Sequence, residues 1–216
     1  MIDLKDVHLT IKGRPILGGV NLRVKRGEFV FLSGPTGVGK SSVLRLIHFD
    51  LLPTSGSVRV ERFESSRIRP SDIPRVRRMI GFIFQDYKLL RDRDVFANVA
   101  FALRVTGVNK SLIHRKTMGA LAAVGMTHRR TAWPDELSGG ECQRIAIARA
   151  LALEPFILLA DEPTGNLDSK TSDEFLQLLT DINRAGTAVI MATHNKNLIS
   201  GTPFRVEFMS EGRIQS

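Results

Sequence analysis

The stretch Gly34-Pro-Thr-Gly-Val-Gly-Lys-Ser41 has the residue types and spacing of a phosphate-binding loop. It follows an apolar run at residues 28–33 and opens a segment with helical spacing at residues 40–49, the context that such a loop requires. Its glycines let backbone N–H groups point inward, and the helix N-terminus adds partial positive charge. We therefore predict that nucleotide phosphates bind to Gly34, Pro35, Thr36, Gly37, Val38, Gly39, Lys40, Ser41 and Ser42.

Four side chains in two stretches could carry the chemistry of phosphoryl transfer. Lys40 offers a mobile cation for the β and γ phosphates, and the Ser41 hydroxyl suits Mg²⁺. The apolar run 156–161 ends in Asp161 and is followed by Glu162, and the C-terminal ends of buried strands are where α/β sheets bind ligands. We expect Asp161 to hold Mg²⁺ through water and Glu162 to polarise the attacking water.

A second glycine-containing motif is Leu137-Ser-Gly-Gly-Glu-Cys-Gln-Arg144. A serine and two glycines at the start of an apolar helix make a second anion site like the first. The alternative is that Ser138 only caps the helix. One nucleotide does not need two such cradles from the same chain. We therefore predict that this second cradle serves a nucleotide bound on a partner molecule.

Together these motifs resemble the ABC (ATP-binding cassette) ATPases over nearly the whole chain. The resemblance implies ATP hydrolysis with Mg²⁺, and it adds Gln85 as a metal-sensing and catalytic glutamine, Asp168 as the D-loop aspartate and His194 as a γ-phosphate contact. It also implies that two copies form a head-to-tail homodimer on binding ATP. The residues that serve the partner's nucleotide are then Ser138, Gly139, Gly140 and Glu141.

Two positions depart from the family pattern. Glu141 stands where many members carry glutamine. The aromatic residue that usually stacks on adenine falls near Ile11, and residues 7–19 contain no Phe, Tyr or Trp. Losing a base stack costs on the order of 1–3 kcal/mol, so we expect modest nucleotide affinity and weak base selectivity.

The order of expected elements predicts an α/β protein. The resemblance refines this to a P-loop NTPase of the ABC type in a single domain, 1–216. Its RecA-like core (1–85 and 154–216) carries an N-terminal antiparallel β region, and an inserted helical subdomain (86–153) carries the second glycine motif. Periodicity predicts helices at 40–49, 95–105, 111–124, 139–153 and 169–184, and strands at 20–24, 28–33, 57–60, 80–84, 156–161, 188–193 and 204–210.

Composition narrows the possible partners. Lys and Arg outnumber Asp and Glu by 31 to 22, and this net charge of +9 favours anionic partners. The basic cluster at 67–78 is either a solvated face or a surface for anionic lipids, and both readings stay open. With one Tyr and one Trp, the chain lacks the aromatic platform of a single-strand binder, so no nucleic-acid partner is expected. The single cysteine, the lack of a membrane-length apolar run and the lack of a secretory signal favour the cytoplasm.

Within the family, the chain is most similar to bacterial cell-division ATPases, chiefly through Asp92-Arg-Asp-Val-Phe-Ala-Asn-Val99 and Ala160-Asp-Glu-Pro-Thr-Gly-Asn-Leu-Asp168. This resemblance implies an integral membrane partner on a separate polypeptide and a location on the cytoplasmic face of the inner membrane. The first alternative is the ATPase of a lipoprotein- or macrolide-export system. Two others are a soluble ABC ATPase acting on nucleic acid or ribosomes, and a scaffold that binds ATP without turnover.

Overall fold

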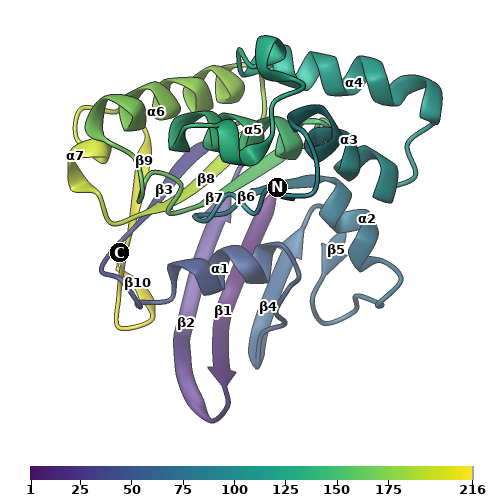
Figure 1. Cartoon of the computed structure of the whole chain (residues 1–216). Helices are drawn as coiled ribbons and strands as arrows, with labels where there is room; N and C mark the ends of the chain where they lie inside the picture. Colours follow the sequence, from purple (N-terminus) through teal and green to yellow (C-terminus); the bar gives the residue numbers. More distant parts are fainter. Residues whose placement is uncertain (216) are drawn as a thin grey trace.

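The computed structural model describes residues 1–215 and contains two β-sheets with helices on both sides of the larger one (Figure 1). The smaller sheet is antiparallel, in the order β2-β1-β4-β5. Its strands are β1 (Ile2–Ile11), β2 (Arg14–Val24), β4 (Ser55–Val60) and β5 (Phe63–Glu64).

The larger sheet has the order β10-β9-β3-β8-β7-β6 and is parallel except where β10 joins β9. Its strands are β3 (Phe29–Ser33), β6 (Ile80–Ile83), β7 (Ile157–Asp161), β8 (Ala188–Thr193), β9 (Arg205–Ser210) and β10 (Arg213–Gln215). Neighbours in this sheet are far apart in sequence, so the chain must leave it and return. The carboxyl ends of β3, β7 and β8 lie together, which is where ligands bind in such sheets.

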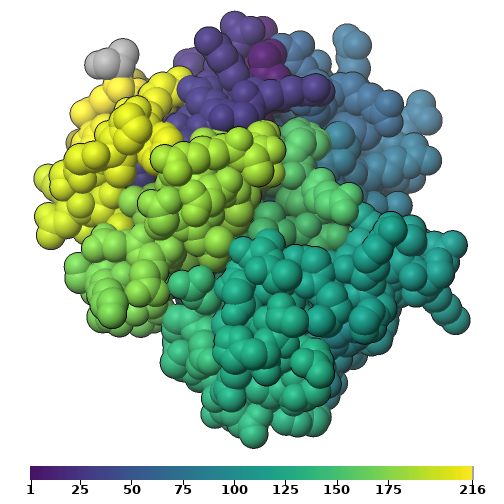
Figure 2. All heavy atoms as spheres, turned by 90° about the horizontal axis from the view of Figure 1, so that it is seen from above, coloured from purple at the N-terminus to yellow at the C-terminus, as the bar shows by residue number. Residues whose placement is uncertain are grey.

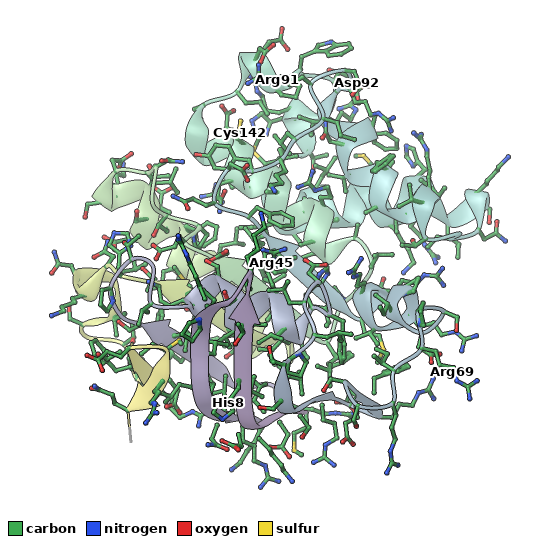
Figure 3. All side chains as sticks on the ribbon, turned by 90° about the horizontal axis from the view of Figure 1, so that it is seen from below. His8, Arg45, Arg69, Arg91, Asp92 and Cys142 are labelled. Carbon is green, nitrogen blue, oxygen red and sulfur yellow. The ribbon has the colours of Figure 1, made fainter. Side chains whose placement is uncertain are left out.

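Most helices lie between β6 and β7 or around the larger sheet. They are α1 (Lys40–Ile47), α2 (Ile73–Arg78), α3 (Val95–Val105), α4 (Lys110–Ala123), α5 (Gly139–Leu151), α6 (Ser169–Arg184) and α7 (Lys196–Ile199). Seen from above, the helical segment forms a lobe, coloured teal, at one end of the molecule (Figure 2). Figure 3 places Arg91, Asp92 and Cys142 in this lobe, far from His8 on β1. No helix of residues 1–215 is long and apolar enough to cross a bilayer.

The larger sheet separates two hydrophobic clusters. On β3, Val30 and Leu32 face the cluster shared with α1 and the small sheet, whereas Phe29 and Phe31 face the cluster under the helical lobe and α6. This alternation is the period of two that a strand imposes on its side chains. Both faces of the strand are buried, which explains why residues 29–33 read as a continuous apolar run.

Helix α5 approaches the edge of the sheet closely at Gly81 in β6. A Cβ atom at Gly81 would lie 2.7 Å from Leu158 Cδ1 and 3.0 Å from the carbonyl oxygen of Ala150 on α5. Only glycine therefore lets the helix and the strand meet at this distance. The contact fixes the C-terminal part of α5 against the sheet.

The predicted fold class is confirmed: an α/β core, an antiparallel region at the N-terminus and helices inserted between β6 and β7. The helix predictions for α3 and α6 match the observed ends, and α5 ends at Leu151, two residues before the expected 153. Strand β1, helices α2 and α7, and strands β5 and β10 are additions that periodicity missed. Shifts in register between Leu4 and Val7 and between Leu9 and Thr10 interrupt the alternation of β1.

Candidate nucleotide site

The phosphate-loop residues connect β3 to the first turn of α1, as the motif requires. Gly34 has φ 144°, and a Cβ atom there would lie 2.3 Å from the carbonyl oxygen of Met209, so the position needs glycine. Gly39 precedes α1 and provides no side-chain cap. The N–H groups of the first turn have no side-chain acceptor and can meet an anion.

Lys40 lies inside this loop with only 5% of its side chain exposed. Its ammonium donates hydrogen bonds to the carbonyl oxygens of Gly34 at 2.8 Å and Pro35 at 2.9 Å. It also lies 3.1 Å from the Glu162 carboxylate. A buried ammonium with these partners is held in place before any ligand arrives, and a phosphate oxygen can join or replace them.

Ser41 and Asp161 meet beside the loop. The Ser41 hydroxyl donates a hydrogen bond of 2.8 Å to Asp161 Oδ1. Burial raises the pKa of Asp161, and the hydrogen bond from Ser41 opposes that rise. Both atoms are the hard oxygen ligands that Mg²⁺ prefers. Among residues 1–215 no three His, Cys, Asp or Glu side chains cluster as a metal site.

Glu162 and His194 form the opposite wall. The Glu162 carboxylate lies between the Lys40 ammonium and His194 Nδ1, within hydrogen-bonding distance of the ring nitrogen. Glu162 has φ 47°, a left-handed conformation that non-glycine residues rarely adopt, and its N–H donates to the Ala192 carbonyl of β8. Such strain at a carboxylate in a cavity is common at functional sites.

These side chains enclose one cavity of about 310 Å³. It is lined by Ile16, Thr36, Gly37, Gly39, Lys40, Ser41, Ser42, Gln85, Glu162 and His194. The structure therefore brings together Gln85, at the end of β6, with residues that follow β3, β7 and β8. Gly34 and Pro35 line an adjoining hollow with His194, and Val38 packs against the core.

The second glycine motif lies apart from this cavity. Ser138, Gly139, Gly140 and Glu141 line a separate hollow of about 360 Å³ with Asp168 and Thr171. Among the described residues, the two hollows share no lining side chain. The structure thus places two candidate anion sites on one chain and does not bring them together.

Ser138 caps helix α5, which was the alternative reading of this motif. Its hydroxyl oxygen accepts from the N–H of Glu141, and the Glu141 carboxylate accepts from the N–H and hydroxyl of Ser138. These hydrogen bonds hold the pKa of Glu141 below its usual range, so the carboxylate is ionised at neutral pH. Arg129 Nε lies 3.2 Å from its other oxygen. The cap uses part of the helix N-terminus that an anion would use, so an anion at this site must share these donors with Ser138 and Glu141.

Asp168 caps the neighbouring helix, α6. Its carboxylate accepts from the N–H of Thr171 at 2.9 Å and from the Thr171 hydroxyl at 2.7 Å. These bonds lower the pKa of Asp168. The side chain is fully exposed beside the second hollow, so its remaining lone pairs face solvent in the single chain.

Two residues that sequence reasoning missed lie at or near the site. Ile16 lines the nucleotide cavity, whereas Ile11, expected near the adenine, pairs with Arg14 and packs on the core. Arg149 holds the segment that follows Gln85. Its signal was present in the sequence, because it is the one charged residue in the apolar run 145–153.

Comparison with known proteins identifies the family of this chain. The family model described as "ABC transporter" matches residues 17–165. The chain belongs to the ABC transporter family.

Curated relatives of this ABC ATPase carry the name "Cell division ATP-binding protein FtsE". The protein from Mycobacterium tuberculosis is 48% identical over 216 residues, covering 99% of this chain and 94% of the relative. Those from Bacillus subtilis and Escherichia coli K12 are 42% and 43% identical, covering 99% and 94% of this chain and 94% and 91% of theirs. The resemblance to cell-division ATPases predicted from the sequence is confirmed.

Solved structures of ABC cassettes have the same fold. The dimeric ATP-binding cassette MJ0796, in a post-hydrolysis state with ADP and Pi, matches with a TM-score of 0.87 and 33% identity. The match covers 100% of this chain and 97% of the other. A second dimeric MJ0796 structure matches with a TM-score of 0.89 and 35% identity, with the same coverage. The chain is an ATPase of this type.

Proposed function

We propose that this ATPase is the nucleotide-hydrolysing subunit of a membrane complex of the cell-division type and acts as a head-to-tail homodimer. The observation that carries the proposal is the separation of the two anion sites on one chain. A second chain, placed head to tail, supplies the missing half of each site. The MJ0796 cassettes are dimeric, which supports a dimer of this chain.

Hydrolysis follows from the residues around the nucleotide cavity. The loop N–H groups and Lys40 would bind the β and γ phosphates, and Ser41 and Asp161 would hold Mg²⁺, which would supply charge neutralisation at the phosphates. Glu162 accepts a proton from the attacking water, and its contacts with Lys40 and His194 aim its carboxylate into the cavity. His194 would also contact the γ-phosphate, and Gln85, which lines the same cavity, would sense Mg²⁺ and the attacking water.

The partner's residues complete this site. Ser138, Gly139, Gly140 and Glu141 of one copy cover the γ-phosphate held by the other, and Asp168 lies beside them at the contact. The exposed caps of α5 and α6 supply N–H groups and hydroxyls at that surface. ATP therefore stabilises the dimer by lying between the two chains.

An integral membrane partner, FtsX-like by resemblance, docks in an apolar groove of about 520 Å³. Its walls come from β6, α3 and α5, and its apolar residues include Phe82, Phe84, Val105 and Leu153. Lys88 and Arg149 add positive charge to the lining. This chemistry suits an amphipathic cytoplasmic segment of the partner that carries an acidic residue. Such docking places the ATPase on the cytoplasmic face of the inner membrane.

The Glu162→Gln variant tests the catalytic part of the proposal. The carboxamide cannot accept the water's proton, so we expect turnover to fall by at least about 100-fold, the usual worth of a general base. ATP should still bind, because the phosphate cradle is unchanged, and the variant should accumulate as an ATP-bound dimer in size-exclusion chromatography. Near-normal turnover would remove Glu162 from its role.

The membrane part is tested by co-purification from detergent-solubilised membranes of the native host. We expect an integral membrane protein of the FtsX type to accompany the wild-type chain. The Phe84→Glu variant should lose it, because the groove would then present a carboxylate where the proposed partner carries one. Recovery of an export permease in its place would redirect the assignment to a lipoprotein- or macrolide-export system.

A further inference from the structure

The segment that carries Gln85 has an unusual backbone. Tyr87 and Lys88 have φ of 54° and 48°, so two consecutive residues with bulky side chains adopt the left-handed conformation. L-residues other than glycine avoid this region because the Cβ atom approaches the carbonyl oxygen. Something outside the segment must hold it, since an isolated pair of such residues would relax.

Arg149 donates two hydrogen bonds to this segment from another element, α5. Its Nη1 donates to the carbonyl oxygen of Lys88 at 2.5 Å, and its Nη2 donates to that of Tyr87 at 2.7 Å. The planar fork of the guanidinium matches two neighbouring carbonyls, which a single ammonium cannot do. Burial lowers the pKa of Arg149, and the attraction of the Asp86 carboxylate offsets only part of this lowering.

The same arginine lines the apolar groove, and the segment that it binds follows Gln85, which lines the nucleotide cavity. It lines the apolar groove together with Phe84 and Lys88, and Lys88 Nζ stands 4.6 Å from the centre of the Phe84 ring. Gln85 lies between Phe84 and the left-handed pair and lines the nucleotide cavity. Residues 84–88 are therefore a short strip with the groove on one side and the nucleotide on the other.

We propose that Arg149 is a positioning residue for Gln85, holding residues 87 and 88 in the left-handed conformation that presents Gln85 to the nucleotide. A partner seated in the groove then changes hydrolysis by pressing on this fork. The inference deepens the proposed function and depends on the role given there to Gln85.

The test compares Arg149→Lys, Gln85→Ala and the double variant in steady-state ATP hydrolysis by the purified full chain. Lysine keeps the charge and loses the fork. We expect kcat of Arg149→Lys to fall by about 10-fold or more, as for a small misplacement of a catalytic group. Nucleotide affinity, measured with a fluorescent ATP analogue, should change by less than about twofold because the phosphate cradle is untouched. The double variant should hydrolyse ATP no more slowly than Gln85→Ala, since both changes disrupt the same function, that of Gln85.

Arg77→Lys is the matched control. Arg77 also donates to two consecutive carbonyls, those of His48 and Phe49, beside the same groove. Its segment carries no residue of the nucleotide cavity, so its kcat should stay near the wild-type value. Amide hydrogen exchange gives a readout independent of activity: residues 84–88 should exchange faster in Arg149→Lys and not in Arg77→Lys.

The outcomes separate this inference from its premise. Normal turnover of Gln85→Ala would overturn the role of Gln85 and the inference with it. Impaired Gln85→Ala with additive loss in the double variant overturns the role of Arg149 alone. Unchanged turnover and unchanged amide hydrogen exchange in Arg149→Lys would also overturn the role of Arg149 and leave that of Gln85.

Discussion

The two helix N-termini that bear glycine motifs differ in how complete they are. At α1, the cap is a glycine without a side chain, the first turn has no acidic residue, and Lys40 is buried and aimed by two carbonyls. At α5, Ser138 and Glu141 close a capping box and satisfy each other, and Ser138 is exposed. The first end is prepared for an anion, whereas the second already has its partners.

This difference explains why one chain needs another. An anion that approaches α5 must share or displace the Ser138–Glu141 bonds and meet an ionised carboxylate, which makes the site weak alone. An anion that is already bound at the α1 end of a second chain is held there by that chain, so it does not depend on the weak α5 site for its binding. We infer that the α5 end gains its ligand only through dimerisation.

Blocking the α5 end should give the largest effect. Ser138→Arg places a bulky side chain where the partner's γ-phosphate must enter, so hydrolysis should fall by more than about 100-fold, as when a transition-state donor is removed. Binding of ATP to the monomer, measured by calorimetry, should stay nearly intact. Ser138→Ala is the comparison that removes the cap and the hydroxyl without adding bulk, and loss of the cap costs about 1 kcal/mol of stability.

Mixing Ser138→Arg with Glu162→Gln sharpens this result. In the heterodimer, one site combines the intact Lys40, Glu162 and His194 of the first chain with the intact α5 end of the second. Activity should recover in the mixture, provided that the damaged site lets the dimer close. Wild-type hydrolysis by Ser138→Arg alone, independent of protein concentration, would refute the dimer mechanism.

Removing the cation from the α1 end should have the next largest effect. Lys40→Ala deletes a charge-assisted contact worth about 1.5–3 kcal/mol, so ATP affinity should weaken by roughly 10- to 150-fold. Calorimetry with Mg·ATP measures it. Unchanged affinity would mean that the backbone N–H groups of the loop bind the phosphates without help.

A smaller effect is expected from substitutions that test which residue near the α1 end contacts the adenine base. Ile11→Tyr restores an aromatic near the expected adenine and should tighten ATP binding roughly fivefold, the lower end of base-stacking energies. Ile16, which lines the cavity, is the matched position. Tighter binding in Ile16→Tyr and not in Ile11→Tyr would move the base contact to Ile16.

The smallest effect concerns the charge at the α5 end. Glu141→Gln keeps an oxygen for the capping box and removes the negative charge from the second anion site. In the Glu162→Gln background, the ATP concentration at half-maximal dimer should fall about threefold, the size of a helix-terminal charge effect. A higher concentration would show that Glu141 aids closure, for example through Arg129.

Much of the fold was predictable because local signals and packing agreed. Helix α3 begins after the cap Asp94 and α6 after Asp168, and both have clear apolar faces, so their ends were readable. Helix α2 was missed because Pro74 and three arginines leave Val76 as its one buried side chain. Strand β1 was missed because its bulges shift the pairing with β2 and break the alternation.

The candidate site divides in the same way. Lys40, Asp161 and Glu162 were predictable because each lies in a motif with a recognisable context. Lys40 lies in a glycine-rich loop before a helix, and the two acidic residues follow an apolar strand. The capping box of Ser138 was weighed as an alternative, but its coexistence with an anion site needed geometry. The left-handed pair at Tyr87 and Lys88 had no signal, because neither residue favours that conformation and the hydrogen bonds from Arg149 come from a distant part of the sequence.

The tight contact between Gly81 and α5 gives the helix a fixed point about which it can tilt. The contact is at Ala150, whose carbonyl oxygen faces Gly81, and the neighbouring Arg149 lines the groove. Gly139 lies eleven residues from Ala150, or about 16 Å at 1.5 Å per residue, so a tilt of about 4° about this contact would move the N-terminus of α5 by about 1 Å. We expect a partner that shifts α5 at the groove to move the N-terminus of the helix more than it moves Arg149, because the N-terminus lies farther from the contact with Gly81.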